Sequence, residues 1–103
     1  MSSASITSRG GGRFGVEGVL DFSTVTPLLA EGERLLRGRG RLEIDLQGVS
    51  TSNSAGLALL LEWMGVARRR NLNLRYRNLP ESLARLAALT NLIGVLPVVK
   101  GGA

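Results

Sequence analysis

Apolar residues recur at two different spacings along the chain, and the change from one to the other predicts a strand followed by a helix. From Leu42 to Gln47 every second residue is apolar, as in a strand with one buried face. Residues 55–66 form an apolar run too rich in leucine and alanine for a strand, and the basic residues 68–70 close it. The polar residues between the two segments therefore form a strand-to-helix turn.

The N-terminal part of the chain predicts a hairpin and a first helix. Residues 4–8 and 14–20 have strand-like patterns, and the glycine run 10–12 between them is typical of a hairpin connection. Thr26 is expected to cap the helix that follows, with Pro27 at its first position, where a missing N–H costs nothing. Glycines at 38 and 40 are expected to end this helix.

The C-terminal part predicts one more strand and one more helix. Residues 72–77 alternate between apolar and polar, and a helix is expected to start at Pro80. Residues 92–99 are interpreted as a last short helix or strand. The whole chain, 1–103, is expected to be a single domain, with residues 1–3 and 101–103 flexible.

These patterns predict an α/β fold built on a small mixed β-sheet with helices covering one face. Each predicted strand is apolar on only one side, so the helices must cover that side. Strands 42–47 and 72–77 are joined by a helix and are therefore expected to be parallel, with a right-handed crossover.

The composition argues against an enzyme. The chain has no histidine and no cysteine, which removes the usual general base, the thiol nucleophile and most metal sites. The one lysine, Lys100, lies in a glycine-rich tail, and no two carboxylates stand out as a pair. The glycine run after Arg9 is not a phosphate-binding loop, because no Gly-Lys-Ser/Thr follows it. We therefore predict no catalytic residue, no cofactor and no metal.

The net charge of +5 comes almost wholly from arginine. Nucleic acid is not the expected partner, because residues 68–70 lie where a helix end favours cations and residues 75 and 77 lie on the solvent side of a strand. One Trp, one Tyr and two Phe provide no array on which bases could stack. An acidic protein surface or anionic headgroups would suit this charge.

The ends of the chain and its apolar run bear on localisation. Residues 1–7 are small and polar and do not resemble a signal peptide. The apolar run at 55–66 is too short to span a bilayer. A cytoplasmic location is therefore predicted.

The turn before the central helix is the candidate site. Ser52, Asn53 or Ser54 is expected to cap the helix by accepting a hydrogen bond from a first-turn N–H group. A hydroxyl there sits at the positive end of the helix dipole, where a phosphate or a partner's carboxylate is also favoured. From the residues alone, Ser54 either only caps the helix or belongs to a binding site.

The central helix has an apolar stripe wider than one sheet contact needs, because residues 57, 60, 61 and 64 share one face and residues 59, 63 and 66 another. We therefore predict that Trp63 lies at a partner-facing or rim surface. The alternative is a buried Trp63 in a thick core.

The predicted order of elements, and residues 44–50 leading into residues 53–57, resemble the STAS domain, the fold of bacterial anti-sigma factor antagonists. The family's motif is Asp-Ser/Thr-x-Gly-Leu. Ser54 occupies its hydroxyl position, which the resemblance implies is phosphorylated or regulatory, and Gly56 and Leu57 match its end. Asn53 replaces the usual Asp, which removes a carboxylate that could help position the hydroxyl for phosphoryl transfer.

Within this family, residues 56–61 and 91–97 look most like the small STAS subunit of the Mla phospholipid-transport ABC transporter of Gram-negative bacteria. This implies a non-catalytic regulatory subunit that binds the cytoplasmic ATPase subunit at the inner membrane and helps to maintain outer-membrane lipid asymmetry. The alternative is an anti-sigma factor antagonist whose binding to an anti-sigma factor kinase is switched by phosphorylation at Ser54. Asn53 and the basic charge favour the transporter subunit. The predicted partner-binding or regulatory residues are Ser52, Asn53, Ser54, Ala55, Gly56, Leu57 and Trp63.

Overall fold

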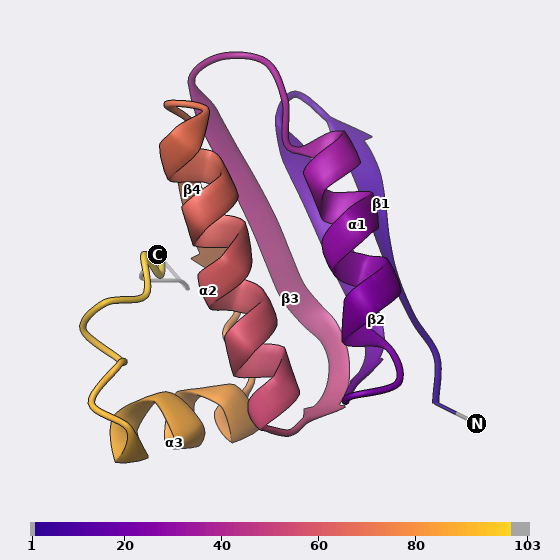
Figure 1. Cartoon of the computed structure of the whole chain (residues 1–103), viewed down its shortest axis with the longest axis vertical. Helices are drawn as coiled ribbons and strands as arrows, with labels where there is room; N and C mark the ends of the chain where they lie inside the picture. The colour runs from indigo at the N-terminus through magenta and orange to yellow at the C-terminus, as the bar shows by residue number, and fades with distance from the viewer. Residues whose placement is uncertain (1, 100–103) are drawn as a thin grey trace.

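The computed structural model describes residues 2–99, in which an N-terminal β-hairpin is followed by alternating helices and strands (Figure 1). The strands are β1 (Ala4–Gly10), β2 (Arg13–Leu20), β3 (Arg41–Ser52) and β4 (Asn73–Arg77). The helices are α1 (Val25–Leu35), α2 (Ser54–Arg69) and α3 (Glu81–Leu89). The predicted flexibility of residues 1 and 101–103 lies outside the described residues. Ser3, also expected to be flexible, is tied to β2, because its carbonyl accepts a hydrogen bond from the Val19 N–H at 2.9 Å.

The four strands form one mixed sheet in the order β1-β2-β3-β4. β1 and β2 are antiparallel, whereas β3 is parallel to both β2 and β4. α1 connects β2 to β3, and α2 connects β3 to β4, as parallel strands require. This arrangement confirms the predicted α/β fold with a mixed sheet.

The core lies between the sheet and the pair α1 and α2, which run side by side over one face of the sheet (Figure 1). α3 crosses below the end of the sheet at which α2 begins. Leu42, Ile44 and Leu46 of β3 are buried, in agreement with the alternation in the sequence. Tyr76 of β4 is fully buried, and its hydroxyl donates a hydrogen bond to the Leu60 carbonyl of α2 at 2.6 Å. Burial raises the pKa of this phenol.

Some element boundaries differ from the prediction. β3 continues beyond residue 47 to Ser52, because Thr51 and Ser52 pair with Val19 and Leu20 of β2. The segment 92–99 is neither a regular helix nor a strand. Within this segment, Val98 pairs with Tyr76 of β4 in an isolated parallel β-bridge.

The predicted start of α1 at Thr26 and Pro27 is wrong by two residues, because the helix begins at Val25. The hydroxyl of Thr24, at the cap position, donates a hydrogen bond to the Val19 carbonyl at 2.8 Å. Pro27 is still in the first turn, where helical N–H groups have no partner within the helix. α1 ends at Leu35, ahead of the glycines that were expected to end it.

Trp63 belongs to the core, and the prediction that it faces a partner is wrong. Its exposed fraction is 0%, and its indole N–H donates to the Leu29 carbonyl of α1 at 3.4 Å. α1 can lie this close because residue 32 is glycine, and a Cβ built there would overlap the indole ring. The wide apolar stripe of α2 is thus covered by the sheet on one side and by α1 on the other.

We predict that Gly32→Ala lowers the free energy of unfolding by about 1–3 kcal/mol, because the added methyl group forces the indole of Trp63 to move. Gly65→Ala, in α2, is the matched control. The nearest atom to a Cβ built at Gly65 belongs to the Arg69 guanidinium, at 3.4 Å. The control should therefore be neutral or stabilising by up to about 1 kcal/mol, as expected from helix propensity. Urea unfolding followed by Trp63 fluorescence measures both, and equal effects would contradict this account of the packing.

Candidate functional site

Two strand-to-helix turns lie next to each other at one end of the sheet. β2 and β3 are parallel neighbours, so their C-terminal ends reach the same edge, and each leads into a helix there (Figure 1). The Asn53 N–H in the β3–α2 turn donates to the Leu20 carbonyl at the end of β2, at 3.1 Å. The two turns therefore form one continuous surface.

Asn53 is the cap of α2. Its side-chain oxygen accepts a hydrogen bond from the Ala55 N–H at 2.8 Å, as a capping residue should. Ser54 is the first residue of the helix and is exposed, and its hydroxyl has no hydrogen-bond partner among residues 2–99. Of the three capping alternatives, the structure selects Asn53, and this leaves the Ser54 hydroxyl available to a partner.

Gly56 is required by packing. A Cβ built on it would overlap the Ser52 hydroxyl oxygen and lie 3.0 Å from the Leu20 Cβ. Glycine therefore lets the first turn of α2 pack against the ends of β2 and β3. The Ser52 hydroxyl donates to the Asn53 carbonyl at 3.0 Å. Among the predicted site residues, Asn53 and Ser54 are exposed, Ser52 is half-buried, and the next three are buried: Ala55, Gly56 and Leu57.

The neighbouring turn, residues 21–24, is held by its own hydrogen bonds. The Asp21 carboxylate accepts from both the N–H and the hydroxyl of Ser23, at 2.9 and 2.6 Å, and the Asp21 N–H donates to the Thr24 hydroxyl at 3.0 Å. The hydroxyls of Ser23 and then Ser2 lower the pKa of Asp21 to about 2. A fixed carboxylate thus lies next to Phe22, whose side chain is 74% exposed.

An apolar hollow of about 180 Å³ opens between the N-terminal parts of α1 and α2. This hollow was not predicted, because in the sequence Phe22 stands out only as one of four aromatic residues. The available signal was a large apolar residue between Asp21 and Ser23, outside the alternation of β2. The residues that line the hollow are Phe22, Val25, Thr26, Leu29, Ala55, Ala58, Leu59 and Glu62.

The arrangement offers a free hydroxyl at the positive end of a helix, an uncharged cap and an apolar hollow beside an exposed aromatic ring. Such a surface can bind a protein side chain or hold a modified serine. Over the described part of the chain there is no cluster of His, Cys, Asp or Glu side chains that could hold a metal ion. Within residues 2–99, no helix combines the length and apolarity needed to cross a bilayer.

The hairpin, the two parallel crossovers and the capped start of α2 define an α/β fold of the STAS type. The chain belongs to the family described as "Mlab, STAS domain", whose model matches residues 7–98. The predicted STAS resemblance is therefore confirmed.

Among solved structures, the chain is similar to the crystal structure of an anti-sigma factor antagonist from Mycobacterium paratuberculosis, with a TM-score of 0.69. The two are 20% identical, and the match covers 95% of this chain and 86% of that chain. At this identity the likeness shows the fold alone. Comparison with curated proteins gives no significant match.

We predict that an NMR titration gives Asp21 a pKa of about 2, and that Ser23→Ala raises it towards the ordinary value of 3.8. Because the pKa is lower in the folded than in the unfolded chain, the stabilisation is complete above the unfolded value and is lost as the pH falls from about 4 towards 2. The stability of Ser23→Ala should therefore depend less on pH in this window. An ordinary pKa for Asp21 in the wild type would contradict the turn geometry.

Proposed function

We propose that this protein is a non-catalytic regulatory subunit that binds a protein partner through a docking surface formed by Phe22, Asn53, Ser54 and the apolar hollow between α1 and α2. The observation that carries the proposal is the exposed Phe22 beside that hollow. An aromatic anchor next to a pocket of side-chain size is typical of the energetic centre of a protein interface. The free hydroxyl of Ser54 adds a position at which charge can control binding.

The partner we propose is the cytoplasmic ATPase subunit of a phospholipid-transport ABC transporter. Membership of the family described as "Mlab, STAS domain" supports this choice. Asn53 supports it as well, because the asparagine keeps the helix cap without the carboxylate of the phosphorylation motif. In this role the protein is cytoplasmic, is held at the inner membrane through its partner, and contributes to outer-membrane lipid asymmetry.

The second candidate function is that of an anti-sigma factor antagonist, with an anti-sigma factor kinase as partner. The fold shared with such an antagonist and the exposed Ser54 hydroxyl favour it. In this role phosphorylation of Ser54 would abolish binding. Both candidates use the same docking surface, and they differ in the partner and in whether Ser54 is ever modified.

We predict that Ser54→Glu folds normally and fails to retain its partner. Negative charge is favoured at the start of a free helix, so the isolated chain should tolerate the change. Inside a docked surface the same charge loses its hydration, which costs several kcal/mol when it is unpaired. The measurement is a pull-down of the purified ATPase subunit, and of the kinase in parallel, with circular dichroism to check folding.

Two further variants complete this experiment, one as a control and one as a second test of the docking surface. Ser54→Ala should keep both the fold and the partner, because Asn53, and not Ser54, caps α2. Phe22→Ala should weaken binding by about 2 kcal/mol or more without a large loss of stability, because the ring is an exposed anchor. If folded Ser54→Glu and Phe22→Ala both retain the partner fully, the docking surface has been assigned wrongly.

We also predict that Asn53→Asp separates the two candidate functions. Asp is as good a cap as Asn, so the helix start should be preserved. If the chain is an anti-sigma factor antagonist, the restored carboxylate should increase phosphorylation of Ser54 by the candidate kinase, measured by mass spectrometry. If the chain is the transporter subunit, neither the wild type nor Asn53→Asp should be phosphorylated, and both should bind the ATPase subunit.

A further inference from the structure

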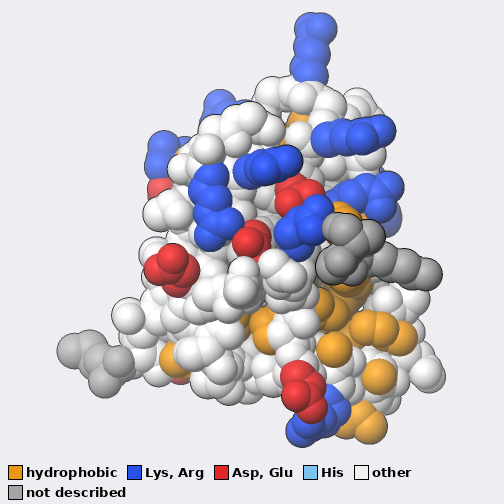
Figure 2. Space-filling view, turned by 180° about the vertical axis from the view of Figure 1, so that it is seen from behind, with side chains coloured by type: hydrophobic (Ala, Val, Ile, Leu, Met, Phe, Trp, Pro, Cys, Tyr) orange, Lys and Arg blue, Asp and Glu red, His pale blue; other side chains and the backbone are white. Residues whose placement is uncertain are grey.

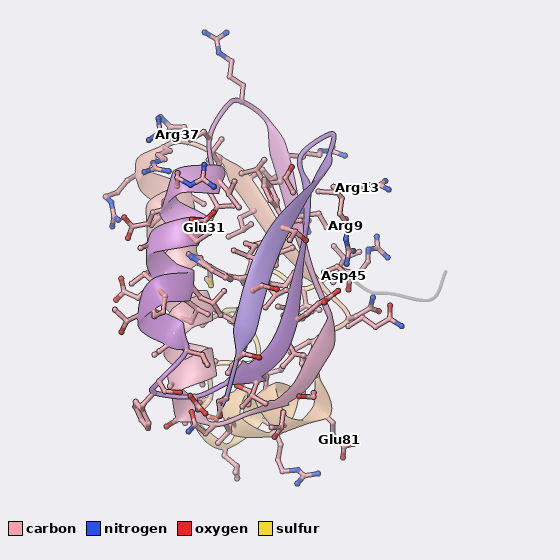
Figure 3. All side chains as sticks on the ribbon, turned by 90° about the vertical axis from the view of Figure 1, so that its right-hand side faces the viewer. Arg9, Arg13, Glu31, Arg37, Asp45 and Glu81 are labelled. Carbon is pink, nitrogen blue, oxygen red and sulfur yellow. The ribbon has the colours of Figure 1, made fainter. Side chains whose placement is uncertain are left out.

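The face of the sheet turned away from α1 and α2 is strongly basic. Arg9 and Arg13 project from this side, opposite α1 (Figure 3), and arginine side chains gather over the upper half of the face (Figure 2). All four strands contribute arginines, and the neighbouring carboxylates come from β3. The arginines concerned are Arg9, Arg13, Arg41, Arg75 and Arg77.

Strand register places these side chains in rows across the sheet. Arg13 of β2, Glu43 of β3 and Arg75 of β4 are direct neighbours in one row. Adjacent strands are about 4.8 Å apart, so the backbones at Arg13 and Arg75 are about 10 Å apart. Arg41 precedes Glu43 by two residues on the same face, about 7 Å along β3. Three cations therefore surround one small area.

Two other arginines on this face are already paired. Arg77 donates from Nε to the Glu43 carboxylate at 2.7 Å, and Arg9 donates to Asp45 at 3.0 Å. The Arg9 guanidinium crosses β2 at Gly15, where a Cβ would overlap it.

The paired carboxylates remain ionised at neutral pH. The hydrogen bond from Arg77 lowers the pKa of Glu43. Partial burial on its own would raise the pKa of Asp45, but hydrogen bonds from Asn78, from the Gln47 N–H and from Arg9 outweigh it and lower the pKa. The charges of Arg77 and Arg9 are thus offset. Among residues 2–99, no ion-pair partner is found for Arg13, Arg41 or Arg75.

These three arginines line one hollow of about 370 Å³, named here the arginine hollow. The hairpin tip closes one side of it. Gly12 has a φ of +78°, and a Cβ built on it would lie 2.6 Å from the Arg41 carbonyl oxygen, so only glycine brings the tip this close to β3. Glu43 also lines the hollow, and its pairing with Arg77 reduces its repulsion of an anion.

We propose that the arginine hollow binds a phosphate group through the guanidinium groups of Arg13, Arg41 and Arg75. The planar fork of a guanidinium matches phosphate oxygens, and such charge-assisted hydrogen bonds are the strong ones. The phosphate comes either from the headgroup of an anionic phospholipid or from a soluble phosphomonoester. The site lies on the opposite side of the sheet from the docking surface, and it does not depend on the proposed function.

From the sequence alone, the glycine run after Arg9 does not qualify as a phosphate-binding loop, because the lysine of such a loop is missing. In the fold, Arg41 and Arg75 supply the missing positive charge from β3 and β4. They lie far from the glycine run in the sequence and reach it only through the parallel pairing of the strands.

The test compares wild type with a hollow variant, Arg13→Gln/Arg41→Gln/Arg75→Gln, and with a control that removes the same charge from the helices, Arg34→Gln/Arg68→Gln/Arg85→Gln. Circular dichroism checks folding. Lipid binding is measured by co-sedimentation with phosphatidylcholine vesicles with and without phosphatidic acid. Binding of soluble phosphate is measured by NMR titration with inorganic phosphate and glycerol 3-phosphate.

We expect the wild type to bind in at least one of these assays, and the hollow variant to bind at least about tenfold more weakly. The helix control should stay within about twofold of the wild type, because its arginines lie on the helices and none of them lines the hollow. Binding to phosphatidic acid vesicles alone assigns a lipid headgroup, whereas binding to glycerol 3-phosphate assigns a soluble ligand. No binding by the wild type, or equal losses in the two triple variants, would overturn the proposal. The hollow variant should keep its partner in the pull-down, which separates this proposal from the docking surface.

Discussion

The parallel pairing of β2 with β3 is the constraint on which both proposed surfaces depend. At one end it aligns Leu20 with Ser52 and so brings the two strand-to-helix turns together. At the other end it aligns Arg13 with Glu43, in the row that continues to Arg75. Between these ends the pairing shifts by one residue twice, between Gly15 and Glu17 and between Gly18 and Val19, so the register is set separately at each end. A further one-residue slip at either end would turn the side chains of that segment to the other face, and the surface there would be lost.

The two proposed surfaces depend on different physical means of recognition. On the helix side, Phe22, Asn53 and Ser54 are uncharged, and the carboxylates of Asp21 and Glu62 lie beside them, so binding there depends mainly on burial of apolar area. On the open side, the unpaired charge of three arginines dominates. Such charge acts at longer range but is screened by salt over about 10 Å at 0.1 M ionic strength. Because the two surfaces lie on opposite sides of the sheet, one chain can bind a protein partner and a phosphate group at the same time.

Local patterns were enough to predict the elements, their order and the mixed sheet, because each strand and helix has its own apolar period. Apart from the two ends of α1, the errors arose where a distant part of the chain determines the local structure. β3 extends to Ser52 because β2 offers it hydrogen-bond partners. Trp63 is buried because Gly32, far away in the sequence, lets α1 cover it. The arginine hollow likewise depends on strand register, and neighbours across a sheet cannot be identified from the spacing along one strand.

The motif after β3 also shows why family membership fixes the fold and leaves the function open. Gly56 and Leu57, which match the STAS motif, are buried, and Gly56 is required for α2 to pack on Leu20 and Ser52. The presence of Gly56 and Leu57 therefore indicates that this turn has the conformation of a STAS domain. Asn53 and Ser54 are exposed, and the cap needs no charge at residue 53. Packing thus leaves residue 53 free to be Asp or Asn, and for this reason the fold alone does not decide between the two candidate functions.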